Sequence, residues 1–127
     1  MAINLYQDGE MRALASVLIP SYNSPDLKLT IQSVLEQDYS NIEIILIDDC
    51  SSEFSPKDIE DYINQNKSSN IVDFIISQND CNLGTVKTMN RAFKYARGEY
   101  IFSLAGDDCF YDRQVITDWI NEFEKSK

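Results

Sequence analysis

Two pairs of adjacent carboxylates are the residues of this sequence best placed to do chemistry. Asp48 and Asp49 end the run I-E-I-I-L-I-D-D, and Asp107 and Asp108 end the run Y-I-F-S-L-A-G-D-D. Neighbouring ionised carboxylates repel each other and lose solvation when buried, so they persist where a cation or solvent compensates them. Mg²⁺ takes few protein carboxylates and keeps positions for phosphate oxygens. The pair Asp107 and Asp108 is therefore a candidate metal site.

A helix cap is an alternative interpretation of the second pair. Asp is a favoured N-cap residue, and a helix is expected to begin near Asp112. Asp108 or Asp112 could therefore serve only to cap that helix. Taken alone, the residues favour neither interpretation.

Each carboxylate pair follows an apolar run that is typical of a strand. The predicted strands are Ala15–Pro20, Ile42–Asp49, Ile71–Ser77 and Glu99–Leu104. Continuous apolar runs belong to strands that are covered on both faces, so we expect these strands to be buried.

Helical signals alternate with the strands. Ser24-Pro25 and Ser55-Pro56 each predict an N-cap followed by Pro at the first helical position. The first of these helices is expected to reach about Gln37, and a third helix to run from about Thr85 to a stop at Gly98. The apolar positions expected on the inner faces of the third helix and of the last one, from about Asp112, are Val86, Met89, Phe93 and Ala96, then Val115, Ile116, Trp119, Ile120 and Phe123.

Four strands alternating with four helices predict an α/β fold. A strand rejoins its sheet in parallel only through a long crossover, which is right-handed in nearly all proteins. We therefore expect a doubly wound, mostly parallel, Rossmann-like sheet in three α/β/α layers. It would be one domain over residues 14–127, preceded by an N-terminal arm over residues 1–13.

The polar segments all fall after strand ends. They are Ser21-Tyr22-Asn23, Asp48-Asp49, Asn79 to Gly84 and Asp107-Asp108. In a parallel sheet these loops share one edge and can converge on one ligand. Tyr22 could stack on a base, and Asp49 could accept a hydrogen bond from an imide or a ribose hydroxyl. A metal ion between a diphosphate and the second acidic pair would offset the repulsion from an acidic protein.

Composition excludes several classes of function. The 127 residues carry 11 basic and 21 acidic side chains and no His, a net charge of -10, which disfavours binding to nucleic acid or to an anionic membrane surface. Three scattered Cys fit free thiols, and no apolar run approaches the ~18 residues of a membrane-spanning helix. We expect a cytoplasmic domain without direct membrane insertion, with any attachment to the inner face of the membrane supplied by other regions.

Four ordered motifs between Ser16 and Glu124 carry a family resemblance. They are V-L-I-P-S-Y-N, I-I-L-I-D-D-C-S, N-L-G-T-V-K-T-M-N-R-A and A-R-G-E-Y-I-F-S-L-A-G-D-D. Together they resemble the N-terminal, nucleotide-sugar-binding half of family 2 glycosyltransferases of GT-A fold. The resemblance implies inverting transfer of a sugar from a nucleoside diphosphate, usually UDP, to an acceptor hydroxyl with Mg²⁺ or Mn²⁺. The acceptor would be a saccharide or a lipid-linked molecule in polysaccharide or glycoconjugate synthesis.

The same resemblance assigns residues to the donor. Pro20 and Tyr22 would lie at the base and ribose, Asp49 at a uracil-type imide, Asp107 at the ribose, sugar or metal, and Asp108 at the metal. The full nucleotide-binding set is Pro20, Tyr22, Asn23, Asp49, Asn82, Gly84, Lys87 and Asp107.

Plainer roles remain open for three residues. Gly84 could serve only a turn, Asn90 only a helix-to-loop hydrogen bond, and Lys87 could be a solvated helical Lys. Ala105 stands where many relatives carry a further Asp, so the acidic motif has its shorter form.

No residue of this sequence matches the general base of the family, an Asp or Glu in the second half of the enzyme. We expect that base beyond residue 127, and we expect this chain alone to bind nucleotide weakly without transferring sugar. Two alternatives are a non-catalytic nucleotide-binding or interaction module of the same fold and a receiver-like phospho-signalling domain. The second would need its acidic pair after the first strand and a Lys after a fifth strand.

Overall fold

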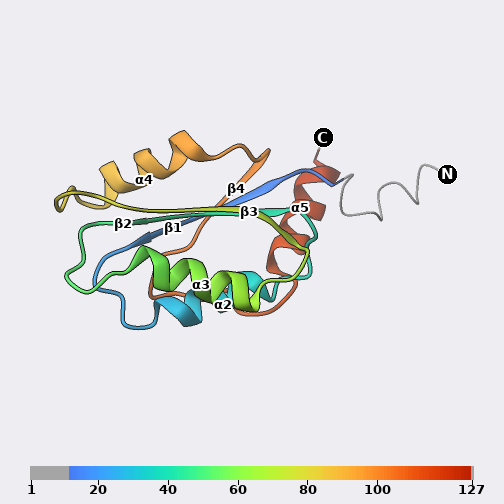
Figure 1. Ribbon diagram of the computed structural model, residues 1–127. Coiled ribbons are helices and arrows are strands. Elements are labelled where there is room, and N and C mark those ends of the chain that lie inside the picture. Colours follow the sequence, from blue (N-terminus) through green and yellow to red (C-terminus); the bar gives the residue numbers. More distant parts are fainter. Residues whose placement is uncertain (1–11, 127) are drawn as a thin grey trace.

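A four-stranded parallel sheet with helices on both faces forms the molecule (Figure 1), and the computed structural model describes residues 12–126. The strands are β1 (Ala15–Ser21), β2 (Ile42–Asp48), β3 (Ile71–Gln78) and β4 (Tyr100–Ser103), and the helices are α2 (Leu27–Leu35), α3 (Pro56–Asn66), α4 (Thr85–Tyr95) and α5 (Val115–Lys125). The strand order is β3-β2-β1-β4 and every pairing is parallel. The predicted doubly wound α/β fold is confirmed. Of the predicted arm, only Arg12 and Ala13 lie within the described residues.

The helices divide the core into two layers. Helices α2, α3 and α5 pack on one face of the sheet, whereas α4 lies on the other (Figure 1). β2 is buried along its whole length because both faces are covered and both edges are paired. The small layer beneath α4 joins Ala92 to Leu18, Ile45 and Ile47.

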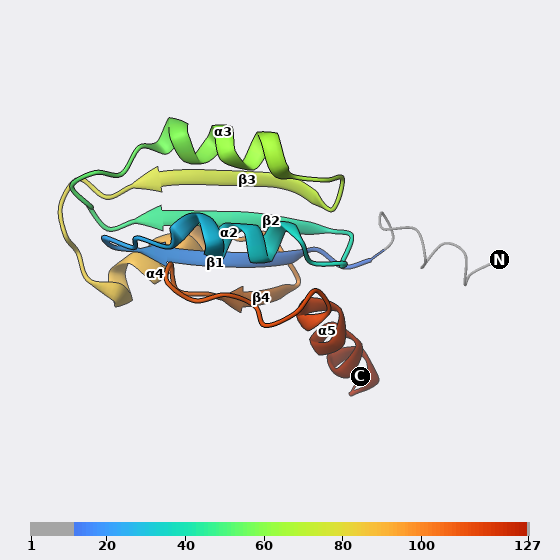
Figure 2. The same ribbon diagram turned by 90° about the horizontal axis from the view of Figure 1, so that it is seen from below.

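β4 is not the buried strand that its apolar sequence predicts. It lies at the edge of the sheet, where it pairs with β1 (Figure 2), and its residues alternate between partly buried and exposed. Ile101 keeps 40% of its surface exposed because α4 packs over β1 and β2 rather than over β4. An apolar run therefore does not by itself distinguish a central strand from an edge strand.

The predicted helix boundaries are correct in one case and wrong in others. Ser55 caps α3 as expected, since its Oγ accepts the N–H of Asp58 at 3.2 Å. Ser24 caps no helix, because α2 begins only at Leu27, and its Oγ instead accepts the N–H of Tyr22 at 3.4 Å. The segment Ser24-Pro25 is a turn ahead of the helix.

Gly98 does not end α4, which stops at Tyr95. Its small size serves another purpose, because a Cβ at this position would lie 2.4 Å from Ser16 Oγ. Gly98 donates its N–H to that same Oγ at 2.8 Å. The residue is required for the close approach of the chain entering β4 to β1.

The predicted inner faces of α4 and α5 are only partly buried. Val115, Ile116 and Ile120 are buried as expected, but Trp119 and Phe123 are 54% and 41% exposed. On α4 the prediction is less accurate, because the buried residues are Thr88 and Ala92. Of the predicted positions, Met89 and Ala96 are partly buried, whereas Val86 and Phe93 are exposed. Phe123 stacks on Tyr100 with 5.5 Å between the ring centroids, but this contact leaves both Phe123 and Trp119 partly exposed. Apolar periodicity therefore locates a face of a helix, whereas burial also requires that the sheet or another helix covers that face.

An ion-pair cluster fastens the end of the sheet opposite the carboxyl edge. Glu43 on β2 is 1% exposed and accepts hydrogen bonds from Ser16 Oγ and from the backbone N–H of Arg97. The Arg97 guanidinium pairs with both Glu43 and Asp73 at 3.1 Å. All the acceptor capacity of the buried Glu43 carboxylate is thus used by these donors.

None of the helices within residues 12–126 has the length and apolar character needed to cross a bilayer.

Candidate functional site

The carboxyl edge of the sheet holds a hollow of about 180 Å³. The end of β1, the loops after β1, β2 and β4, and the first turn of α4 supply its lining residues. They are Pro20, Ser21, Tyr22, Ser24, Asp49, Thr85, Thr88, Ala105, Gly106 and Asp107. Four predicted nucleotide-binding residues, Pro20, Tyr22, Asp49 and Asp107, therefore meet at one place. The convergence of loops expected from the topology is present.

Tyr22 presents the aromatic surface of this hollow. It follows β1 directly and remains 53% exposed. A half-exposed ring at the rim of a polar hollow can stack on a planar ligand, such as a nucleobase, with little rearrangement.

Gly106 allows the acidic loop, which carries Asp107 and Asp108, to pack closely against the loop that carries Tyr22. Its N–H donates to Pro20 O at 2.9 Å, and its carbonyl accepts the hydroxyl of Thr30 at 3.0 Å. A Cβ at this position would lie 2.8 Å from Ser24 Oγ and 2.9 Å from Ser21 Cβ. Only glycine allows this approach, which places Asp107 beside the hollow.

Asp107 and Asp108 are both exposed, and neither carboxylate has a hydrogen bond or ion pair within residues 12–126. Helix α5 begins at Val115 with Gln114 as its N-cap and without a side-chain cap. Asp112 accepts the N–H of Gln114 at 2.8 Å in the turn before the helix. The interpretation of Asp108 as a helix cap is therefore wrong, and its carboxylate remains available to a ligand.

The chemistry of this pair fits a hard divalent cation. Two solvent-facing carboxylates supply oxygen donors, and Mg²⁺ and similar ions fill the rest of their shell with water and phosphate oxygens. The part of the chain that is described contains no cluster of three or more Cys, His, Asp or Glu that could hold a metal without such help. Ala105 contributes no side-chain oxygen. A metal held here would depend on a phosphate ligand.

Asp49 is a buried carboxylate at the wall of the hollow, 5% exposed. Its Oδ1 accepts the N–H of Leu83 at 2.7 Å and the side-chain amide of Asn79 at 2.9 Å, while Oδ2 accepts the N–H of Gly84 at 2.9 Å. Burial raises the pKa of Asp49, but these hydrogen bonds, with one from Thr88, outweigh it and hold the pKa below its ordinary value. Asp49 is therefore an ionised acceptor.

Asp48 has a different environment although it is the next residue. Its Oδ1 accepts the hydroxyls of Ser21 and Ser51, both at 2.7 Å. Its Oδ2 accepts the N–H of Ser51 at 2.7 Å and the amide of Gln78 at 3.0 Å. A carboxylate offers about four acceptor directions, so Asp48 is saturated and ties the ends of β1, β2 and β3 together.

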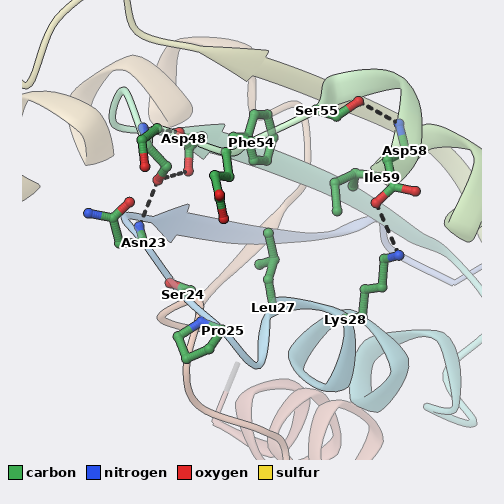
Figure 3. A pocket seen from close by; sticks show the side chains of 13 residues that line it. Asn23, Ser24, Pro25, Leu27, Lys28, Asp48, Phe54, Ser55, Asp58 and Ile59 are labelled. Atoms are coloured by element: carbon green, nitrogen blue, oxygen red, sulfur yellow. Dashed lines mark hydrogen bonds and ion pairs between the residues drawn. The ribbon is translucent and has the colours of Figure 1, made fainter.

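A second hollow of about 480 Å³ lies on the α2 and α3 side of the same edge (Figure 3). Asn23 lines this hollow, with Phe54 and Leu27 nearby and the ion pair of Lys28 and Asp58, 3.0 Å long, at its far end. The Asn23 backbone has a φ of 47°, and its N–H donates to Ser51 Oγ at 2.6 Å. Asn23 thus lines the second hollow and not the one that contains Tyr22, although Ser24 lines both.

The N-L-G segment and the first turns of α4 lie next to the hollow and supply few of its lining residues. Gly84 is the N-cap of α4 and has a φ of +88°. In the turn that this backbone conformation makes, its N–H donates a hydrogen bond to Asp49. Asn82, Lys87 and Asn90 are exposed, line neither hollow and make no side-chain hydrogen bond with described residues. The helix-to-loop hydrogen bond considered for Asn90 is absent among these residues.

Sequence reasoning missed Asn79, Thr88 and Arg91 as individual residues of the site. Asn79 is 4% exposed and links Asp49 to Thr88, and Arg91 donates to Asn79 Oδ1 at 2.8 Å. The available signal was a polar residue directly after an apolar strand, where a buried amide is costly unless it is fully hydrogen-bonded.

Comparison with known proteins identifies relatives of this chain. The model of the family described as glycosyl transferase family 2 matches residues 16–127. The chain is 36% identical over 96 residues to the putative colanic acid biosynthesis glycosyl transferase WcaA of Escherichia coli K12, covering 75% of this chain and 33% of the relative. It is 38% identical over 115 residues to an Escherichia coli enzyme, UDP-Glc:alpha-D-GlcNAc-diphosphoundecaprenol beta-1,3-glucosyltransferase WfaP, covering 90% of this chain and 43% of the relative.

Solved structures give the same picture for the fold. Residues 1–349 of Staphylococcus aureus TarS in complex with UDP-GlcNAc superpose with a TM-score of 0.74 at 28% identity, over 87% of this chain and 31% of TarS. A mannosyltransferase from Pyrobaculum calidifontis in complex with GDP-Man and Mn²⁺ superposes with a TM-score of 0.76 over 89% of this chain and 33% of that protein. At 20% identity the latter shows the fold alone. The chain spans less than half the length of each of these relatives.

Proposed function

Because the chain belongs to glycosyl transferase family 2, we propose that it binds a nucleoside-diphosphate sugar at the carboxyl edge of its sheet. The observation that carries this proposal is the hollow in which Tyr22, Asp49 and Asp107 meet from three separate loops. An aromatic ring and an ionised acceptor suit the base of such a donor, and an acidic pair that has no partner among residues 12–126 suits its ribose and its metal-bound diphosphate.

We propose a UDP-linked donor. The ring of Tyr22 stacks on the base, with Pro20 beside it, and the ionised Asp49 accepts a hydrogen bond from the imide N–H. The names of WfaP and of the TarS complex support this choice, since they specify UDP-Glc and UDP-GlcNAc for those proteins. Asp107 faces the ribose or the sugar.

Asp107 and Asp108 would hold Mg²⁺ or Mn²⁺ together with the diphosphate. When bound, the cation stabilises the negative charge that develops on the departing diphosphate. The protein itself carries a net charge of -10 and would otherwise repel a diphosphate ligand. The two carboxylates therefore make donor binding dependent on the cation.

For the whole protein we propose inverting transfer of the sugar to an acceptor hydroxyl, on a saccharide or a lipid-linked molecule, in polysaccharide synthesis. The names of WcaA and WfaP, one assigned to colanic acid biosynthesis and the other to a diphosphoundecaprenol acceptor, support this assignment. Nucleotide sugars are cytoplasmic metabolites, so the domain would act on the cytoplasmic side of the membrane. The residues assigned here to the donor and the metal do not include a general base for the acceptor hydroxyl.

Isothermal titration of the chain with UDP, with and without Mn²⁺, tests the proposal. We expect binding that requires Mn²⁺ and that is lost in Asp108→Asn. Asp118→Asn is the matched control, because it removes one exposed carboxylate from α5, away from the hollow. Absence of UDP binding in both conditions would refute the proposed function, and equal loss in both variants would refute the assigned metal site.

A further inference from the structure

We propose that Arg91 is a positioning residue for base recognition: acting through Asn79, it orients Asp49 so that the site prefers a base with an imide N–H. The inference rests on the proposed donor-binding function. The residues that carry it are Ser77 on β3, Asn79 in the following loop and Arg91 on α4, none of which lines the hollow. They act on Asp49 and Thr88, which do line it.

Asn79 is the link between Arg91 and Asp49. Its amide nitrogen donates to Asp49 Oδ1 at 2.9 Å and to Thr88 Oγ1 at 3.0 Å, and its oxygen accepts from Arg91 Nη1 at 2.8 Å. An Asn amide can occupy its site in two orientations that differ only in the exchange of oxygen and nitrogen. A guanidinium has donors and no acceptor, so the oxygen must face Arg91 and the NH₂ group must face Asp49.

Arg91 is itself held in place by a second hydrogen bond. Its Nη2 donates to Ser77 Oγ near the end of β3, so the planar fork spans from β3 to the buried amide. A Lys at this position has a single ammonium group and cannot reproduce the fixed fork. The exact position of the Asn79 amide therefore depends on the guanidinium fork and not simply on a positive charge.

Loss of Arg91 removes the constraint on Asn79. The buried oxygen of Asn79 is then left without its donor, so the amide can move to find another one and weaken the hydrogen bond that it donates to Oδ1 of Asp49. Asp49 would then shift relative to Leu83 and Gly84, whose N–H groups donate its other hydrogen bonds. The carboxylate would no longer be fixed where it meets the edge of the base.

The base offers a way to observe this change. Uracil carries an N–H at the imide position, whereas cytosine has an unprotonated acceptor there. A fixed, ionised carboxylate accepts from the first and repels the second, and a buried group left without its partner discriminates strongly. The ratio of UDP to CDP affinity therefore reports the orientation of Asp49.

Titration of UDP and CDP in the presence of Mn²⁺, on wild type, Arg91→Met and Arg91→Lys, tests the inference. We expect wild type to prefer UDP by about tenfold or more, Arg91→Met to lose most of that preference mainly through weaker UDP binding, and Arg91→Lys to fall between them. Arg97→Met is the matched control. It removes a guanidinium that holds a buried side chain at the opposite end of the sheet, so it should lower stability and leave the ratio unchanged.

The outcomes separate the two proposals. If wild type binds neither nucleotide, the proposed function fails. If wild type binds UDP but does not prefer it to CDP, or if the preference survives in Arg91→Met, the role of Arg91 is refuted. An equal loss of UDP and CDP affinity would also refute it, since a general structural defect has that effect. Should Arg91→Met not fold, Arg91→Lys decides by the same ratio.

Discussion

The two acidic pairs of this protein have the same sequence pattern and opposite environments. Asp48 and Asp49 are 1% and 5% exposed and accept hydrogen bonds from donors on four segments of the chain. Asp107 and Asp108 are exposed and accept none from the described residues. Both pairs follow an apolar strand at the same edge of the sheet.

The position of the preceding strand accounts for the difference. β2 lies inside the sheet, so the ends of β1 and β3 and the start of α4 surround its carboxyl end with donors. β4 lies at the edge and has β1 on one side. Most acceptor positions of the interior pair therefore hold loops together, and of its two residues only Asp49 lines the hollow of Tyr22, whereas the pair after the edge strand keeps its oxygens for a ligand.

The largest expected effect is that of Asp48→Asn on stability. In wild type the donors around Asp48 share two carboxylate oxygens, and the substitution replaces one oxygen with an NH₂ group. Buried donors are then left unpaired, which should lower the free energy of unfolding by about 3 kcal/mol. Asp108→Asn, the matching change in the exposed pair, should stay within about 0.5 kcal/mol of wild type. Urea denaturation measures both, and similar losses would remove the distinction between the pairs.

Gly106→Ala should have the next largest effect, because Gly106 places the exposed pair beside the loop of β1. The added Cβ overlaps Ser24 Oγ and Ser21 Cβ, and overpacking of this kind costs about 1–3 kcal/mol. The acidic loop should move away from Tyr22, so UDP affinity should fall along with the melting temperature. Wild-type affinity in this variant would show that the close approach is unnecessary for the ligand.

The exposed pair should bind Mn²⁺ with the help of nucleotide, and the buried pair should not. We expect the electron paramagnetic resonance signal of free Mn²⁺ to decrease when UDP is added to wild type, and this change to weaken about tenfold or more in Asp107→Asn. Glu53→Gln, an exposed carboxylate of the second hollow, is the control. Unchanged Mn²⁺ binding in Asp107→Asn would place the metal elsewhere.

The smallest expected effect is the pH dependence that Asp49 contributes. Its pKa in the folded protein lies below its ordinary value of 3.8, so its stabilising contribution is present above that value and is lost as the pH falls through the folded pKa. The difference in unfolding free energy between wild type and Asp49→Asn should therefore narrow below about pH 4. A constant difference down to about pH 3 would mean that the pKa of Asp49 is not lowered in the folded protein, and a difference that grows in favour of wild type as the pH falls would mean that burial outweighs hydrogen bonding.

Much of the fold follows from local patterns. The strand predicted at Ile42–Asp49 is observed at Ile42–Asp48, and Ser55 caps its helix, because apolar runs and capping residues act over a few positions. Failures occur where distant segments decide. The hydroxyl of Ser24 accepts the N–H of Tyr22 and caps no helix, and Trp119 lies on a face of α5 that remains about half exposed.

The site was predictable as a place but not as a set of contacts. Topology alone brings Tyr22, Asp49 and Asp107 to one edge, and that convergence is observed. The separate environments of Asp48 and Asp49 depend on donors about 30 residues away in Gln78 and Asn79, which no local pattern reveals. Arg91 reaches Asp49 only through Asn79, so a local pattern reveals its contribution even less.

The pairing of β4 with β1 also bears on the order in which the molecule assembles. Ala15 pairs with Ile42 on one side and with Tyr100 on the other, so the second contact closes a far longer loop of chain. Closing a longer loop costs more entropy, and contacts distant in sequence form more slowly. We expect pulsed hydrogen exchange during refolding to protect β1, β2 and β3 before β4. The ability to bind a metal and its nucleotide would then mark the final step of folding.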